Sequence, residues 1–138
     1  MEKLKRFGVS MPDSLLKNFD EFIKKHKYKN RSEAIRDIIR EKFVEEEWEK
    51  GKEVVGCIVI VYEHDVREIV DKIIDVQHKF SSIIISSQHV HMDKENCMEI
   101  IVVKGKVEKI KDLYFYLKAL KGVKYSAITK ATSGKSLK

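Results

Sequence analysis

Cysteine, proline and long apolar runs are all scarce in this sequence, and two of these shortages exclude a class of protein. Two Cys in 138 residues cannot form the disulfide framework that holds small secreted domains together. No apolar run approaches the roughly 20 residues that a membrane-spanning helix needs, and the N-terminus lacks the apolar core of a signal peptide. We therefore expect a cytoplasmic protein without a membrane partner.

The sequence also lacks the residue patterns of common catalytic sites. No nucleophile stands beside a base, and no pair of carboxylates occupies a convincing setting. Lys104-Gly-Lys106 lacks the strand, glycine-rich loop and helix that surround a phosphate-binding loop. We therefore do not expect an enzyme.

Charge, in contrast, is abundant and unevenly distributed. Residues 1–43 hold twelve Lys or Arg against seven Asp or Glu, within a net charge of +6 for the chain, and the acidic run Glu45–Glu49 reverses the sign directly afterwards. A small basic N-terminal module would suit nucleic acid as a partner. Basic faces are also often only solvated, so charge alone does not decide this.

A pattern of metal ligands lies within nine residues, from His89 to Cys97. Side chains alternate along a strand, so His89 and His91 would fall on one face. If residues 93–95 reverse the chain, Cys97 returns opposite His91, and Glu99 returns opposite His89. Two imidazoles and a thiolate would then converge, which favours Zn, Cu, Ni or Co over Mg²⁺ or Ca²⁺. A polar strand edge with incidental His residues is the simpler alternative, and a fourth ligand stays unassigned.

The first fifty residues predict one strand and two helices. Apolar side chains alternate over residues 6–11, as in a half-buried strand. They then recur at helical spacing to about residue 25 and again over residues 31–48, where Asn30 and Glu33 resemble a capping box. One strand and two helices cannot enclose a core, so we expect this module to dimerise.

This strand, the first helix and the segment Asn30-Arg-Ser-Glu-Ala-Ile-Arg-Asp37 resemble the ribbon-helix-helix family of DNA-binding repressors. In that family two chains pair their strands into a ribbon that lies in the major groove of double-stranded DNA. The resemblance implies that Arg6, Gly8 and Ser10 face the bases. Gly8 has no side chain with which to read a base, so the operator sequence does not follow from these residues.

The start of the second predicted helix is a candidate phosphate site. Amide groups around Asn30, Arg31 and Ser32 would hold a phosphate through their geometry and the helix dipole. Plain helix capping also explains these residues, and the two roles are compatible.

From residue 51 onward the pattern is that of a mixed domain. Helical patterns span residues 66–80 and 107–121, the second ended by Gly122, and strand patterns span residues 53–62, 82–92, 96–104 and 123–129. The order β-α-β-β-α-β is that of a ferredoxin-like domain. The sequence thus predicts an α+β protein with a β-α-α ribbon-helix-helix domain over residues 1–50 and a βαββαβ domain over residues 51–138.

A basic ribbon-helix-helix module ahead of a βαββαβ domain with Gln77-His78, Gln88-His-Val-His91 and Cys97-Met-Glu99 closely resembles the nickel-responsive transcriptional regulator (NikR) family. The resemblance covers nearly the whole chain. It implies that the second domain is ACT-like and forms the core of a homotetramer, a dimer of dimers, with two ribbon-helix-helix dimers outside it.

The same resemblance implies the cofactor, Ni(2+), and its ligands. One nickel ion would lie in a square-planar site made by His89, His91 and Cys97 of one subunit and His78 from another. Planar coordination by nitrogen and sulfur suits Ni(II) or Cu(II), whereas Zn(II) prefers a tetrahedron. Without the resemblance, His78 would be read as a solvated residue at a helix end. His64 would be read as a strand-end residue or as part of a secondary metal site.

Other residues would support these sites. Glu99, Gln77 and Tyr62 would orient the metal ligands, because a ligating His usually needs a partner for its other nitrogen; core packing explains Tyr62 equally well. Glu33 and Asp37 lie one helical turn apart, and in the nickel-responsive family such a pair would take an alkali cation between the DNA-binding and metal-binding domains. Exposed carboxylates on a helix face are the commoner explanation of such a pair.

Two functions are consistent with the sequence. The first is a nickel-dependent repressor that binds a palindromic operator, tightens on it when nickel binds, and by resemblance controls nickel uptake genes. The alternative is an ACT-like sensor of a metal or small ligand whose N-terminal module only dimerises. Replacing Arg6 and Ser10 by Ala distinguishes these two functions. If DNA binding stays intact, the strand does not read DNA.

Overall fold

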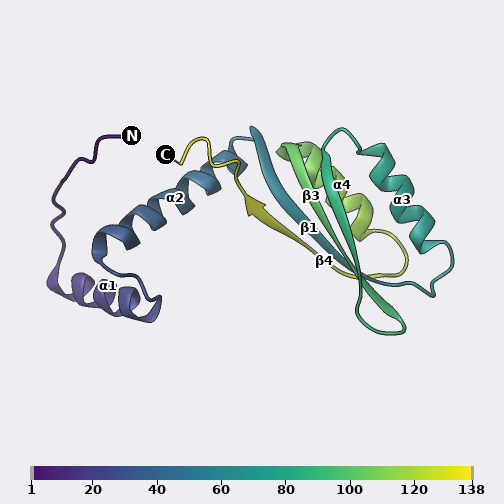
Figure 1. Cartoon of the computed structure of the whole chain (residues 1–138), viewed down its shortest axis with the longest axis horizontal. Coiled ribbons are helices and arrows are strands. Elements are labelled where there is room, and N and C mark those ends of the chain that lie inside the picture. The colour runs from purple at the N-terminus through teal and green to yellow at the C-terminus, as the bar shows by residue number, and fades with distance from the viewer. Residues whose placement is uncertain (1, 138) are drawn as a thin grey trace. The chain divides into compact units, whose positions relative to one another are not determined.

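The computed structural model of the chain describes residues 2–137 (Figure 1). Contacts divide the chain into two units, Met1–Glu41 and Lys42–Lys138. Helix α2, which runs from Arg31 to Glu49, begins in the first unit and ends in the second. The domain boundary expected from the sequence, between residues 50 and 51, stays a prediction.

The first unit consists of an extended N-terminal segment, helix α1 over Asp13–Lys25 and the first part of α2. Residues 2–12 form neither helix nor strand. The strand expected over residues 6–11 does not form in the single chain, because a strand needs a hydrogen-bonding neighbour, and residues 2–41 contain no strand beside it. Its apolar side chains are left uncovered, with Phe7 75% and Val9 57% exposed.

The start of α2 is capped nearly as the sequence indicates. The Asn30 side chain accepts a hydrogen bond of 2.9 Å from the backbone N–H of Glu33. The Glu33 carboxylate in turn accepts one of 3.2 Å from the backbone N–H of Lys29, one residue before the donor of a standard capping box. The helix therefore begins at Arg31, where the sequence places it.

The second unit has the predicted order β-α-β-β-α-β. Its elements are β1 (Glu53–Glu63), α3 (Ile69–Lys79), β2 (Ile84–His91), β3 (Asn96–Lys106), α4 (Val107–Lys118) and β4 (Val123–Ala131). The strands lie in the order β2-β3-β1-β4, and all neighbours are antiparallel. The predicted α+β class and ferredoxin-like topology are confirmed.

Two helix boundaries differ from the sequence prediction. Helix α3 begins at Ile69 rather than residue 66, because Glu68 has a left-handed backbone with φ of 65°. Helix α4 ends at Lys118, so Gly122 does not cap it directly; its φ of 105° instead serves the turn into β4.

Helices α3 and α4 cover one face of the sheet (Figure 1). Alternate residues of β1 and β3 point to this face and are buried, among them Ile58, Ile101 and Val103. They pack against apolar residues of the helices, including Ile73 and Leu113. Each side chain of this kind contributes about 1.5–3 kcal/mol through burial, so this layer provides the core.

Within residues 42–137, no layer covers the opposite face of the sheet. Its residues on β1 and β3 alternate with the buried ones and are mainly apolar: Val55, Cys57, Val59, Val61, Met98, Ile100 and Val102. Tyr125 of β4, which pairs with Val61, is 63% exposed. We call this set, with Tyr125, the open sheet face.

Candidate metal centre

The β2–β3 hairpin has the register that the alternating pattern predicts. His91 lies opposite Cys97, and His89 lies opposite Glu99. The Asp93 carboxylate forms the turn by accepting hydrogen bonds from the backbone N–H groups of Glu95 at 2.9 Å and Asn96 at 2.8 Å. Together with the Asn96 side chain, these donors hold the pKa of Asp93 below its usual value.

This register brings three candidate ligand residues together. The ligand atoms of His89, His91 and Cys97 all lie within 4.8 Å of one another, and no other His, Cys, Asp or Glu group in residues 2–137 meets this test. The two imidazole rings are 4.7 Å apart between centroids. Both His residues are exposed, and Cys97 is fully buried.

The Cys97 thiol lies between two imidazoles. Its Sγ atom is 3.4 Å from Nδ1 of His91 and 3.6 Å from Nδ1 of His64. Burial, followed by the nearby carboxylates of Asp65, Asp93 and Glu99, raises the pKa of Cys97. A cation at this point would favour the thiolate that these surroundings oppose, and nitrogen and sulfur donors fit a transition metal. From the sequence alone, His64 is predicted to have no more than a peripheral role, because only the pairing of β1 with β3 brings it to the thiol.

His89 has Tyr62 and Glu99 as neighbours at Nδ1, and Gln77 contacts Glu99. The Tyr62 hydroxyl is 2.9 Å from Nδ1 of His89, and the Gln77 amide donates a hydrogen bond of 2.7 Å to Glu99. Burial above all, then the charges of Glu99 and Cys97 and a hydrogen bond with Glu99, raises the pKa of Tyr62 to about 12. The phenol therefore stays protonated at neutral pH. It can accept Nδ1–H of His89 and donate to Glu99, which leaves Nε2 of His89 for a metal.

His78 is not part of this cluster within one chain. It lies in the last turn of α3 and is exposed. Val70 and Ile74 precede it at four-residue spacing and are 42% and 45% exposed, so the three form one stripe on the helix. An uncovered apolar stripe that ends in a His suits contact with a second chain.

The candidate DNA-contacting residues lie in the first unit. Arg6, Gly8 and Ser10 are exposed in the extended N-terminal segment. Arg31 is held by Asp20 through two hydrogen bonds of 2.8 Å, from Nε and from the terminal nitrogen. The backbone N–H groups of Arg31 and Ser32 belong to the first turn of α2, where a helix supplies no acceptor. Their contacts with DNA stay predictions.

Glu33 and Asp37, the candidate cation ligands, line a hollow of about 440 Å³ with Tyr28, Arg36 and Arg40. The Tyr28 hydroxyl donates to Asp37, and this bond raises the pKa of Tyr28 to about 12. Glu33 already accepts the N–H of Lys29. Both carboxylates thus have partners within the chain, and the cation site stays a prediction.

An α+β chain whose ferredoxin-like unit gathers two His and one Cys on a hairpin belongs to the class of metal-binding proteins with a separate helical module. Family models identify both parts. Residues 5–46 match the ribbon-helix-helix protein family of the CopG type, and residues 55–131 match the NikR C-terminal nickel-binding domain. The chain belongs to the nickel-responsive regulator family, whose cofactor is nickel. The family consists of transcriptional regulators, not enzymes.

Full-length relatives agree with this assignment. A protein of Thermococcus onnurineus that carries the provisional name nickel-responsive regulator is 49% identical over 98% of this chain and 99% of its own length. One of Dictyoglomus turgidum with the same provisional name is 51% identical over 93% of this chain and 96% of its own. The resemblance stated from the sequence is therefore confirmed.

A solved structure shares the fold of the second unit. An uncharacterized protein of Thermotoga maritima matches 56% of this chain and 96% of its own with a TM-score of 0.52 and 20% sequence identity. That level of identity supports the fold alone. No helix within residues 2–137 combines the length and hydrophobicity needed to cross a membrane.

Proposed function

We propose that this chain is a cytoplasmic, nickel-dependent DNA-binding repressor that works as a homotetramer on a palindromic operator controlling nickel uptake genes. The observation that carries the proposal is the convergence of His89, His91 and Cys97 in a chain that also has a ribbon-helix-helix module. A metal-dependent repressor needs these two parts, one that senses the metal and one that reads DNA.

In this proposal His89, His91 and Cys97 hold the nickel ion, and His78 of a second subunit is the fourth ligand. The support is chemical and geometric: two nitrogen donors and one sulfur donor lie within 4.8 Å. The fourth donor lies on an exposed apolar stripe of α3, where a second subunit can pack. Bound nickel would supply a positive centre that joins the hairpin of one subunit to α3 of another.

Three uncovered apolar surfaces support a tetramer. They are the open sheet face, the α3 stripe with Val70 and Ile74, and the N-terminal segment with Phe7 and Val9. Soluble proteins rarely leave contiguous apolar surface of this kind exposed. A homotetramer with twofold axes uses self-complementary interfaces, so the open sheet face and the N-terminal segment can each pack against their own copy, and the α3 stripe of each subunit can pack against the hairpin of the other.

DNA binding would begin with pairing of the N-terminal segments. When two copies pair residues 6–11 as antiparallel strands, Phe7 and Val9 turn toward the helices and Arg6, Gly8 and Ser10 turn outward. Arg6 and Ser10 can then donate to base edges in the major groove. The first-turn N–H groups around Asn30, Arg31 and Ser32 would hold a phosphate and fix the register on the duplex.

The proposed increase in DNA affinity on nickel binding is tested with DNA that the nickel-loaded protein selects from a randomised pool. Fluorescence anisotropy of that DNA should give an affinity at least about fivefold higher with nickel than without, the lower end of ordinary coupling between two sites. Replacing Arg6 and Ser10 by Ala should weaken DNA binding while the nickel titration stays unchanged. Equal affinity with and without nickel would contradict the proposal.

The ligand assignment is tested by absorption spectroscopy during titration with Ni(II). We expect a thiolate-to-nickel band that is lost in Cys97→Ala and altered in His78→Ala. His26→Ala is the matched control, because His26 is an exposed His in the first unit. A spectrum indifferent to Cys97 and His78 would mean that the hairpin is not the sensor.

A further inference from the structure

The end of helix α2 is built into the core of the second unit. Trp48, the only Trp of the chain, is 4% exposed and packs in the same cluster as Ile58, Val103 and Val107. Val44, one turn earlier on the same helix face, packs against this cluster. The last two turns of α2 therefore belong structurally to the nickel-binding unit.

Gly56 of β1 forms the seat for the indole ring. A Cβ atom at position 56 would lie 2.8 Å from Cη2 of Trp48, closer than real contacts permit, and 3.1 Å from the carbonyl oxygen of Thr129. Gly56 has an ordinary strand backbone, so its missing side chain makes room for the ring rather than for a special φ. The fit depends on this one position.

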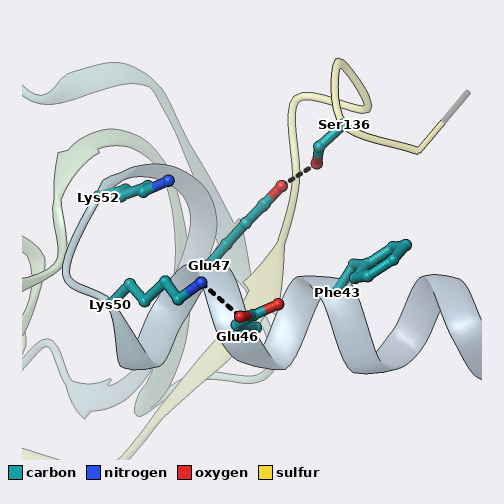
Figure 2. Close-up of a pocket in the computed structure, with 6 residues that line it drawn as sticks. All are labelled: Phe43, Glu46, Glu47, Lys50, Lys52 and Ser136. Carbon is teal, nitrogen blue, oxygen red and sulfur yellow. Dashed lines mark hydrogen bonds and ion pairs between the residues drawn. The ribbon is translucent and has the colours of Figure 1, made fainter.

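Two hydrogen bonds also hold the end of α2 in one orientation. The indole Nε1 donates a bond of 3.0 Å to the carbonyl oxygen of Ala131, at the end of β4. One residue earlier, Glu47 accepts a hydrogen bond from Ser136 of the C-terminal tail, beside a hollow of about 220 Å³ (Figure 2). The sheet and the tail thus fix both the position and the rotation of the helix end.

Helix α2 runs from the first unit into the second, up to the turn that carries Trp48. Helix α2 is continuous from Arg31 to Glu49 and contains neither Gly nor Pro. The left-handed turn at Gly51 lies between Trp48 and Val54, both buried in the second unit, so it cannot be the joint between the units. The helix whose end Trp48 holds is therefore the chain connection between the two units.

We propose that Trp48, seated on Gly56, is the positioning residue through which the nickel-binding unit holds α2 and transmits nickel binding to the DNA-binding module. The inference rests on the function proposed above. It assigns Trp48 neither to nickel nor to DNA, so its replacement should change the coupling between the two sites rather than either site itself.

The test uses the full-length protein and the selected DNA, and compares Trp48→Ala with the wild type. We expect the nickel titration and the DNA affinity without nickel to stay within about twofold, while the nickel-dependent gain in DNA affinity falls by about fivefold or to no gain. Trp48→Phe keeps a ring on Gly56 but loses the bond to Ala131, so it should retain part of the gain. If Trp48→Ala does not fold, Trp48→Phe is used in its place.

Val107→Ala is the matched control, because it removes a buried side chain of α4 from the same core but keeps the indole ring and its hydrogen bond to Ala131. It should lower the melting temperature yet keep the nickel-dependent gain. A full gain in both Trp48 variants, or an equal loss in Val107→Ala, would overturn the inference while the proposed function stands. A wild type without any gain would overturn both.

Gly56→Ala tests the contact between Trp48 and Gly56 by changing the strand instead of the helix. The new methyl group should displace the indole, so the emission of the single Trp should shift to longer wavelength and the nickel-dependent gain should fall as in Trp48→Ala. In the Trp48→Ala background, Gly56→Ala should cause little further loss of gain, because the ring it displaces is already absent. If the two substitutions lower the nickel-dependent gain additively, Gly56 does not act by making room for the Trp48 ring.

Discussion

Gln77 of α3 donates a hydrogen bond of 2.7 Å to Glu99 of β3, and Gln77 directly precedes His78. Glu99 lies opposite His89 in the hairpin. One hydrogen bond therefore connects the turn that carries the proposed fourth ligand to the strand pair that carries the other three. It fixes the end of α3 relative to the hairpin of the same chain.

Gln77→Leu should lower nickel affinity about 10- to 100-fold, the usual cost of removing a residue that orients metal ligands. The leucine fills a similar volume but removes the hydrogen bond from the Gln77 amide to Glu99. Competition against a chelator, followed at the thiolate-to-nickel band, measures the change. Gln88→Leu is the control, since Gln88 lies opposite Ile100 on the open sheet face. Equal affinities in both variants would exclude a role for the Gln77–Glu99 bond.

Tyr62→Phe should lower nickel affinity by about tenfold and leave the fold intact. Tyr62 is 1% exposed, so the ring that packs in the core is kept and only the hydroxyl is lost. Nδ1–H of His89 then loses its acceptor, and the imidazole is no longer fixed with Nε2 directed at the metal. The same chelator competition measures the affinity, and circular dichroism checks the fold. An unchanged affinity would assign Tyr62 to core packing alone.

Val59→Asp should prevent assembly of the proposed tetramer. Val59 is central to the open sheet face, where it pairs with Ile100 on one side and Ala127 on the other. A carboxylate buried there without a partner costs several kcal/mol, enough to disfavour packing of two such faces. Sedimentation velocity should report a smaller species whose urea unfolding is still cooperative. Ser82→Asp adds the same charge in an exposed turn and should leave the tetramer intact.

Much of the hairpin could be predicted because its rule is local. Alternation along a strand and a three-residue reversal are enough to place Cys97 opposite His91, and the structure has this register. The order of strands and helices followed from apolar periodicity in the same way. The N-terminal strand was different: its apolar alternation is real, but a strand needs a hydrogen-bonding neighbour, and residues 2–12 form no strand in the single chain.

Trp48 could not be assigned from the sequence. It stands within the acidic run Glu45–Glu49, where its neighbours on the chain indicate a solvated helix end. Its burial depends on Gly56 and Ala131, which only the assembled sheet brings to it. His64 near Cys97 is a similar case, since neither residue alone signals that β1 and β3 end side by side. Contacts of this kind carry no periodic signal.

Asp20→Asn should strengthen DNA binding a few-fold with little dependence on sequence. Asp20 holds Arg31 through two hydrogen bonds, and these hold the pKa of the Asp20 carboxyl below its usual value. The pair is therefore intact at neutral pH, and it is lost only as the pH falls through the lowered pKa of Asp20. The neutral amide frees the guanidinium to bind a phosphate. The slope of log affinity against log salt concentration should therefore become steeper by about one unit, for one more phosphate neutralised.

Asp13→Asn is the control for this prediction, because Asp13 is an exposed acid of the same helix that pairs with Lys17 at 2.8 Å. It removes the same charge but releases no candidate DNA contact. Adding Arg31→Ala to Asp20→Asn should return the affinity to the wild-type range or below, since the gain depends on the freed guanidinium. If Asp13→Asn strengthens binding as much as Asp20→Asn, the effect is one of net charge, and Arg31 does not contact the phosphate.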